Sequence, residues 1–91
     1  MDEIMLITDI KVFPINRSVG KLRAFVRVVL GYQLQLTGLR IYEGSGGLFV
    51  SYPTDPDYRG EDFRQLFYPV TRELRESIES AVLAKYLEVL K

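Results

Sequence analysis

The ten residues Lys21–Leu30, KLRAFVRVVL, alternate in character along the chain. One parity is apolar throughout: Leu22, Ala24, Val26, Val28 and Leu30. The other parity combines cations with apolar residues: Lys21, Arg23, Phe25, Arg27 and Val29. Alternation with a period of two is typical of a strand that buries one face and leaves the other accessible. The run therefore requires a sheet, and it predicts three cations and one phenylalanine together on one face.

Further strands are predicted on both sides of this run, because β-branched and aromatic residues are separated by turn residues. In the third strand the apolar parity changes at Thr37-Gly38, which predicts a β-bulge there. The predicted strands are Ile4–Ile15, Lys21–Leu30, Gln33–Tyr42, Leu48–Tyr52 and Phe63–Tyr68, with turns at Asn16–Gly20 and Gly31-Tyr32 and a polar loop at Pro53–Asp62.

An amphipathic helix is predicted from Thr71 to Leu90, with Thr71 as its N-cap. Leu83 and Leu87 widen its apolar stripe, which indicates either a broad core contact or an edge that binds a partner. Strands followed by one helix predict a single α+β domain over residues 1–91. We expect a mostly antiparallel sheet of about five strands with the helix on one face. A chain this short would gain stability as a homodimer.

The glycine-rich segment Glu43–Pro53, EGSGGLFVSYP, has two interpretations. A phosphate-binding loop would precede a helix, whose N-terminus holds the phosphate, and a Walker loop would also supply a lysine. Here the residues after Gly47 are Leu-Phe-Val-Ser-Tyr, which read as a strand. We therefore predict a hairpin turn with a positive φ at Ser45-Gly46 or Gly46-Gly47.

Cysteine and histidine are absent from the sequence. Disulfides, thiolate nucleophiles, Cys/His zinc sites and an imidazole base are thereby excluded. Asp55-x-Asp57 lacks the glycine and the terminal glutamate of an EF-hand. We expect no enzyme, no catalytic residue, no metal site and no cofactor. No apolar run reaches the ~18 residues of a membrane span, and no signal peptide is evident, so a cytoplasmic protein without membrane contact is expected.

The charges are unevenly distributed although the formal net charge is zero. Residues 10–42 carry six basic side chains and no acidic one, whereas all 12 acidic residues lie elsewhere. Such an asymmetry indicates an anionic partner. The alternative is a sheet whose exposed lysines and arginines need no partner.

Several short motifs occur in a characteristic order along the chain: Thr8-Asp9-Ile10, Leu22-Arg23-Ala24, Gly47–Val50 with Pro53, Phe63-Arg64, Tyr68-Pro69-Val70, Ala81-Val82-Leu83 and Tyr86. Together they resemble the SpoVG family of bacterial septation and sporulation proteins. The resemblance runs from about Met5 to Tyr86 and implies a cytoplasmic regulator that binds DNA or RNA at preferred sites as a homodimer. It also implies a β-sheet with a C-terminal helix. Many relatives have adjacent Lys and Arg after the Gly-Leu-Phe-Val strand, whereas Thr54–Gly60 has two aspartates and one cation, Arg59.

Two kinds of binding surface follow from these observations. The candidate nucleic-acid residues are Lys21, Arg23, Phe25, Arg27, Arg40, Arg59 and Arg64, with Lys11 as a possible neighbour. The alternative places Phe25 under the helix, ringed by the stems of the cations. The candidate dimer or partner contacts are Leu48, Val50 and Tyr52 on an edge strand and Leu83 and Leu87 on the helix. With those contacts, the chain would instead regulate cell division through a protein partner.

Overall fold

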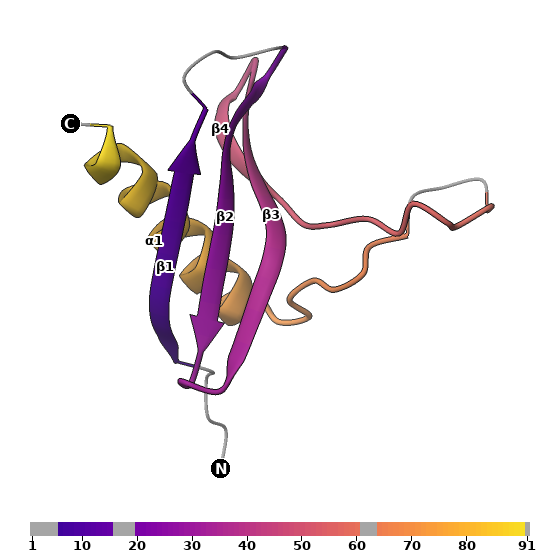
Figure 1. Ribbon diagram of the computed structural model, residues 1–91, viewed down its shortest axis with the longest axis horizontal. Helices are drawn as coiled ribbons and strands as arrows, with labels where there is room; N and C mark the ends of the chain where they lie inside the picture. Colours follow the sequence, from indigo (N-terminus) through magenta and orange to yellow (C-terminus); the bar gives the residue numbers. More distant parts are fainter. Residues whose placement is uncertain (1–5, 16–19, 61–63, 91) are drawn as a thin grey trace.

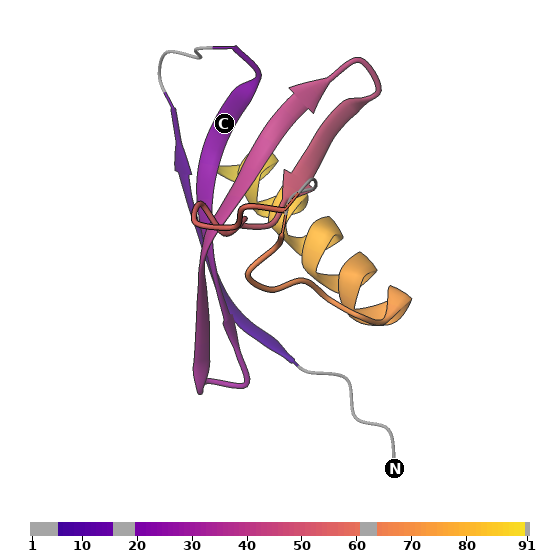
Figure 2. The same cartoon turned by 90° about the vertical axis from the view of Figure 1, so that its right-hand side faces the viewer.

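The computed structural model describes residues 6–15, 20–60 and 64–90, and it contains one antiparallel sheet covered on one face by a helix (Figure 1). The elements in chain order are β1 (Ile7–Pro14), β2 (Leu22–Leu30), β3 (Leu34–Gly44), β4 (Gly47–Ser51) and α1 (Arg72–Val89). The strands lie in the order β1-β2-β3-β4, so each strand pairs with its neighbour in the sequence. Figure 2 shows α1 on one side of the twisted sheet. The predicted α+β architecture is confirmed.

The predicted fifth strand is wrong, since the sheet has four strands. Residues 64–68 lie instead in an arm, described at residues 53–60 and 64–70, that leaves the sheet after β4 and returns to α1 (Figure 1). Among residues 53–60 and 64–70, the two legs of the arm meet at the bridge Thr54–Gln65, and the Leu66 amide donates to the Pro53 carbonyl at 2.8 Å. Pro53 has no N–H to extend the β4 ladder, so the chain turns away there. Phe63 lies outside the described residues.

The core lies between the sheet and α1. Its buried residues are Ala24, Val26, Val28, Leu30, Leu39, Ile41, Val50, Tyr52, Ile78, Val82 and Tyr86. They confirm the apolar parity predicted for β2 at Ala24, Val26, Val28 and Leu30, whereas Leu22 is only half-buried because the register shifts between Leu22 and Ala24. Tyr52 is one of two tyrosines in this core, and its hydroxyl donates to Glu79 Oε2 at 2.9 Å. Burial, together with this hydrogen bond to a carboxylate, raises the pKa of Tyr52 well above its ordinary value.

The predicted bulge in β3 is confirmed. Val26 pairs with Leu39 and Val28 pairs with Leu36, so that Thr37 and Gly38 together oppose one residue of β2. Gly38 has a φ of 87°, and a Cβ built on it would lie 3.1 Å from Pro53 Cβ. Only glycine fits this position without strain.

The glycine-rich segment forms the predicted hairpin turn. Gly44 pairs with Gly47 around Ser45-Gly46, and the positive φ belongs to Gly47 at 115°. The predicted N-cap of the helix is also confirmed, because Thr71 Oγ1 accepts a hydrogen bond from the Leu74 amide at 3.2 Å. Of the predicted turn at Asn16–Gly20, residues 16–19 lie outside the described residues.

Candidate nucleic-acid interface

The sheet face opposite α1 carries aromatic and basic side chains, and we call it the open face. Its residues are Asp9, Lys11, Phe13, Phe25, Arg27, Arg40, Tyr42, Phe49 and Ser51, which alternate with core residues along their strands. Phe25, at the centre of the sheet, keeps 42% of its surface exposed, and Phe13 and Phe49 are similarly exposed. Large apolar rings exposed this far in a continuous row are typical of a binding surface.

The strand register places cations over aromatic rings on the open face. Phe13 pairs with Phe25, and Phe25 pairs with Arg40, so these residues form one row across three strands. The Arg27 guanidinium carbon lies 5.2 Å from the centroid of the Phe13 ring, and that of Arg40 lies 5.6 Å from the Phe25 ring. Both distances are typical of cation–π contacts. The arginines are therefore positioned by hydrocarbon neighbours, which leave their charge uncompensated.

A second aromatic platform lies on β3 and β4. The Tyr42 and Phe49 rings stack with centroids 5.8 Å apart and an interplanar angle of 22°. The tight turn sets this contact, because pairing Gly44 with Gly47 brings Tyr42 opposite Phe49. Arg40 Nη1 approaches the Tyr42 hydroxyl at 3.5 Å and so links this platform to the row through Phe25.

A hollow of about 1170 Å³ lies between this platform and the arm. Arg40, Tyr42 and Phe49 line one side of it, and Tyr58, Arg64 and Tyr68 are among the residues from the arm. The Arg64 guanidinium carbon lies 5.6 Å from the Tyr58 ring centroid, so the arm repeats the cation–aromatic arrangement of the open face. The hollow thus has an arginine on each side and aromatic rings between them.

The open face and α1 differ in how far their positive charges are paired with carboxylates. The open face has three cations, Lys11, Arg27 and Arg40, and one carboxylate, Asp9. Among residues 6–15, 20–60 and 64–90, no carboxylate oxygen lies within 4.0 Å of the charged atoms of Arg27 or Arg40. On α1, by contrast, each of the three cations pairs with a glutamate: Arg72–Glu76, Arg75–Glu79 and Lys85–Glu88.

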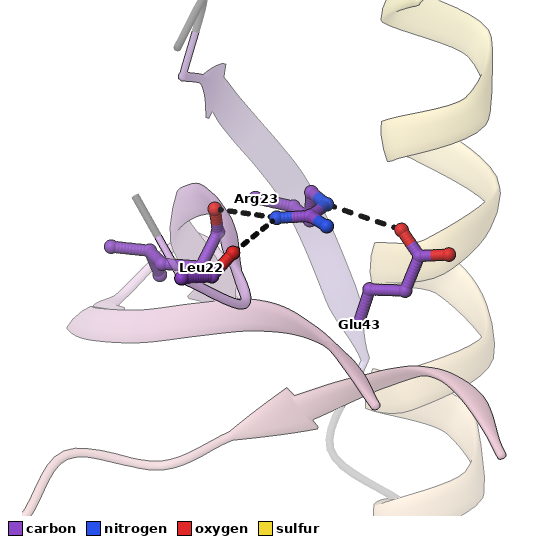
Figure 3. Close-up of polar contacts among 4 residues, drawn as sticks. Leu22, Arg23 and Glu43 are labelled. Carbon is purple, nitrogen blue, oxygen red and sulfur yellow. Dashed lines mark hydrogen bonds and ion pairs between the residues drawn. The ribbon is translucent and has the colours of Figure 1, made fainter. Parts of the chain in front are cut away.

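Arg23 is not brought together with Arg27. Its Nε lies 3.1 Å from Glu43 Oε1, and its Nη1 donates to the carbonyls of Gly20 and Leu22 (Figure 3). The reason is a register shift between Leu22 and Ala24, which interrupts the alternation of β2 at Arg23. The sequence pattern placed Arg23 beside Phe25, whereas the structure ties it to a carboxylate at the end of the hairpin.

The other predicted residues are divided between the open face and the arm. Phe25, Arg27 and Arg40 lie on the open face, so Phe25 does not pack under the helix. Lys21 is exposed immediately before β2, and Arg59 is exposed in the arm.

Sequence reasoning missed three aromatic residues of the site: Phe13, Tyr42 and Phe49. A signal for each was present. Phe13 shares the parity of Lys11, and a two-residue turn at Ser45-Gly46 fixes Tyr42 opposite Phe49.

Most of the residues predicted to contact a partner pack instead against other residues of the same chain. Val50 and Tyr52 are buried in the core, and Leu48 and Leu83 are half-buried against it. Leu87 is exposed on α1.

Among the described residues, no group of three carboxylates is arranged to hold a metal ion. In the same part of the chain, no helix combines the length and apolar character needed to cross a bilayer.

Known proteins match almost the whole chain. Residues 5–88 match the SpoVG family. A protein of Symbiobacterium thermophilum named "Putative septation protein SpoVG" is 44% identical over 90% of this chain, which spans 57% of that protein. A protein of the same name from an Exiguobacterium species is 37% identical over 90% of this chain, which spans 81% of that protein. Another, from Clostridium acetobutylicum, is 35% identical over 93% of this chain, which spans 87% of that protein. The chain therefore belongs to the SpoVG family.

Proposed function

We propose that this protein is a cytoplasmic, non-enzymatic regulator that binds nucleic acid through its open face and acts in septation or in gene expression. The septation role follows from the name of its relatives. The observation that carries nucleic-acid binding is the pair of accessible rings, Phe13 and Phe25, each with an arginine over it, Arg27 on Phe13 and Arg40 on Phe25.

Arginines in this setting suit phosphate binding. Phosphates attract cations that have no carboxylate partner, and each neutralised phosphate releases bound counterions. Cation–π contacts hold the guanidinium groups of Arg27 and Arg40 in place before a ligand arrives. Less conformational entropy is then lost on binding. Asp55 and Asp57 lie in the arm and not on the strands of the open face, and in the part of the chain that the structure describes neither carboxylate lies within 4.0 Å of the charged nitrogens of Arg27 or Arg40.

We further propose that two copies of the chain associate. The arm extends beyond the sheet (Figure 1), and it exposes Leu66, Tyr68 and Val70, the last with 84% of its surface accessible. A neighbouring copy would cover these apolar side chains, and a dimer would double the basic surface. A mass measurement in solution at micromolar concentration tests this, and a mass equal to that of one chain would contradict it.

A protein partner is the second candidate function, with the chain regulating cell division without contacting nucleic acid. Leu87 and Leu90 favour it, because both are exposed near the C-terminal end of α1. Their apolar surface lies away from the open face and suits a protein better than a polyanion.

The test is a fluorescence-anisotropy titration with labelled single-stranded and duplex oligonucleotides. Three phosphate contacts predict affinity about 20- to 40-fold weaker at 200 mM than at 50 mM salt. The double variant Arg27→Glu/Arg40→Glu should weaken binding at least about 100-fold. The matched control, Arg72→Glu/Lys85→Glu on α1, makes the same change in net charge and should leave binding within about threefold. An equal loss in both variants would place binding elsewhere, and no binding at low salt would favour the protein partner.

A further inference from the structure

We propose that the open face binds single-stranded nucleic acid in preference to duplex by stacking bases on its aromatic and guanidinium surfaces. This inference rests on the proposed function and adds the class of nucleic acid and the mode of contact. The residues that would stack bases are Phe13, Phe25, Tyr42 and Phe49, with Arg27 and Arg40 between them.

The first argument is the shape and chemistry of the surface. Phe25 is exposed at the centre of the sheet, and the Tyr42–Phe49 stack lies one strand further toward the β4 edge. Aromatic rings and guanidinium groups are planar, and unpaired bases stack on both. Stacking of this kind tolerates any base sequence, because every base has a π-face.

The second argument is that a duplex could use only part of this surface. The bases of a duplex are stacked on one another and show only their edges in the grooves. The face of a sheet, which is too broad to enter a groove, would therefore meet the phosphates, and its rings would remain without partners. Sequence reading in a duplex groove commonly needs an inserted helix. Here Ile78, Val82 and Tyr86 of α1 are buried against the sheet.

The outer surface of α1 is also unsuited to a polyanion. Of its charged residues four are acidic and three are basic, and each of the basic ones has a glutamate partner. A duplex that approached α1 would meet no uncompensated positive charge there. The open face, with three cations against one carboxylate, has the opposite balance.

The dimensions suit a short single strand. The four strands span three inter-strand spacings of about 4.8 Å, or about 14 Å from β1 to β4. The hollow between the Tyr42–Phe49 platform and the arm continues this path with Tyr58 and Arg64 of the arm. A strand of a few nucleotides could thus pass from the Phe13–Phe25 row to the hollow and have an arginine close by along its length.

The decisive experiment compares three labelled probes of equal length: oligothymidylate, an abasic strand with the same phosphates, and a duplex. We expect oligothymidylate to bind at least about tenfold more tightly than either of the other two. Phe25→Ala and Phe49→Ala should each weaken its binding about 5- to 150-fold and leave duplex binding within about twofold. Thermal unfolding of each variant establishes that it is folded.

The matched control is Tyr32→Asn. Tyr32 is 83% exposed at the turn after β2, away from the open face, and asparagine tolerates its φ of 60°. This change should leave the affinity for every probe unaltered.

Equal affinity for oligothymidylate and the abasic strand would overturn base stacking while leaving the proposed function intact. Absence of binding to all three probes at low salt would overturn both proposals. Conversion of a dimer to a monomer by Phe25→Ala or Phe49→Ala would identify the open face as an interface between copies, which also overturns the inference.

Discussion

Two consecutive pairs of residues on the same two strands show how differently the faces of this sheet are used. Val26 and Leu39 are paired on the helix side and are 1% and 0% exposed. Their immediate neighbours, Phe25 and Arg40, are paired on the open side, meet in a cation–π contact and are both exposed. The backbone geometry is common to both pairs, so what differs is the layer that covers them.

This difference indicates that the helix-covered face of the sheet stabilises the fold, whereas the open face is available for binding. The helix-covered face contributes through burial of apolar area, which amounts to about 1.5–3 kcal/mol for each fully buried large side chain. The open face contributes little to folding because its rings remain in water. Substitutions there are expected to change affinity without unfolding the chain, and substitutions beneath the helix are expected to do the reverse.

The largest effect is expected for Leu39→Ala, which should lower the free energy of unfolding by about 2–5 kcal/mol because it leaves a cavity in the core. Phe25→Ala removes more atoms, yet it should cost about 1 kcal/mol or less because the ring is exposed. Urea denaturation measures both. A greater loss of stability for Phe25→Ala than for Leu39→Ala would refute the division between the faces.

An intermediate effect is expected where the bulge of β3 meets the arm. Gly38→Ala forces a side chain into a positive φ against Pro53 and should cost about 1–3 kcal/mol. Gly46→Ala is the control, since an added Cβ there meets no atom within 4 Å, and it should change stability by less than about 0.5 kcal/mol. Thermal unfolding distinguishes them, and similar losses would mean that the bulge is not under steric constraint.

The smallest effect concerns Tyr52. Its raised pKa means that the folded chain holds the phenolic proton more tightly than the unfolded chain does. This contribution is fully present below the ordinary tyrosine pKa of about 10 and is lost as the pH rises through the higher pKa of the folded chain.

Tyr52→Phe should cost about 0.5–1.5 kcal/mol at neutral pH by removing the hydrogen bond to Glu79. It should also flatten the decline of stability that sets in above about pH 10, where the unfolded chain begins to lose this proton. Urea denaturation across this range is the measurement. An unchanged slope in Tyr52→Phe would show that its proton is not linked to folding.

The sequence predicted elements whose signals are local. The alternation in β2, the parity change at Thr37-Gly38 and the N-cap at Thr71 each depend on neighbouring residues, and all three are found in the structure. A fifth strand was predicted at Phe63–Tyr68 because the composition of this segment suits a strand. A strand also needs a sheet edge to pair with, and Pro53 directs the chain away from the edge of the sheet.

The candidate site was predictable only in part, because it depends on cross-strand register. Arg27 and Arg40 were identified from their charge. The register shift beside Arg23 leaves no mark in the composition, so the sequence did not predict that Arg23 pairs with Glu43. The stack of Tyr42 on Phe49 followed from the turn once its two central residues were fixed. Single-residue shifts decide which face a side chain occupies, and sequence patterns locate such shifts poorly.

The order of the elements has a consequence for the nascent chain. The four strands are adjacent in sequence and pair in that order, so each hairpin can form soon after its residues leave the ribosome. The helix that covers their apolar side is synthesised last, and it packs against the outermost strands, β1 and β4. Until residues 72–89 emerge, a growing chain carries an amphipathic sheet without its cover. Unfinished chains are therefore the form of this protein most prone to self-association.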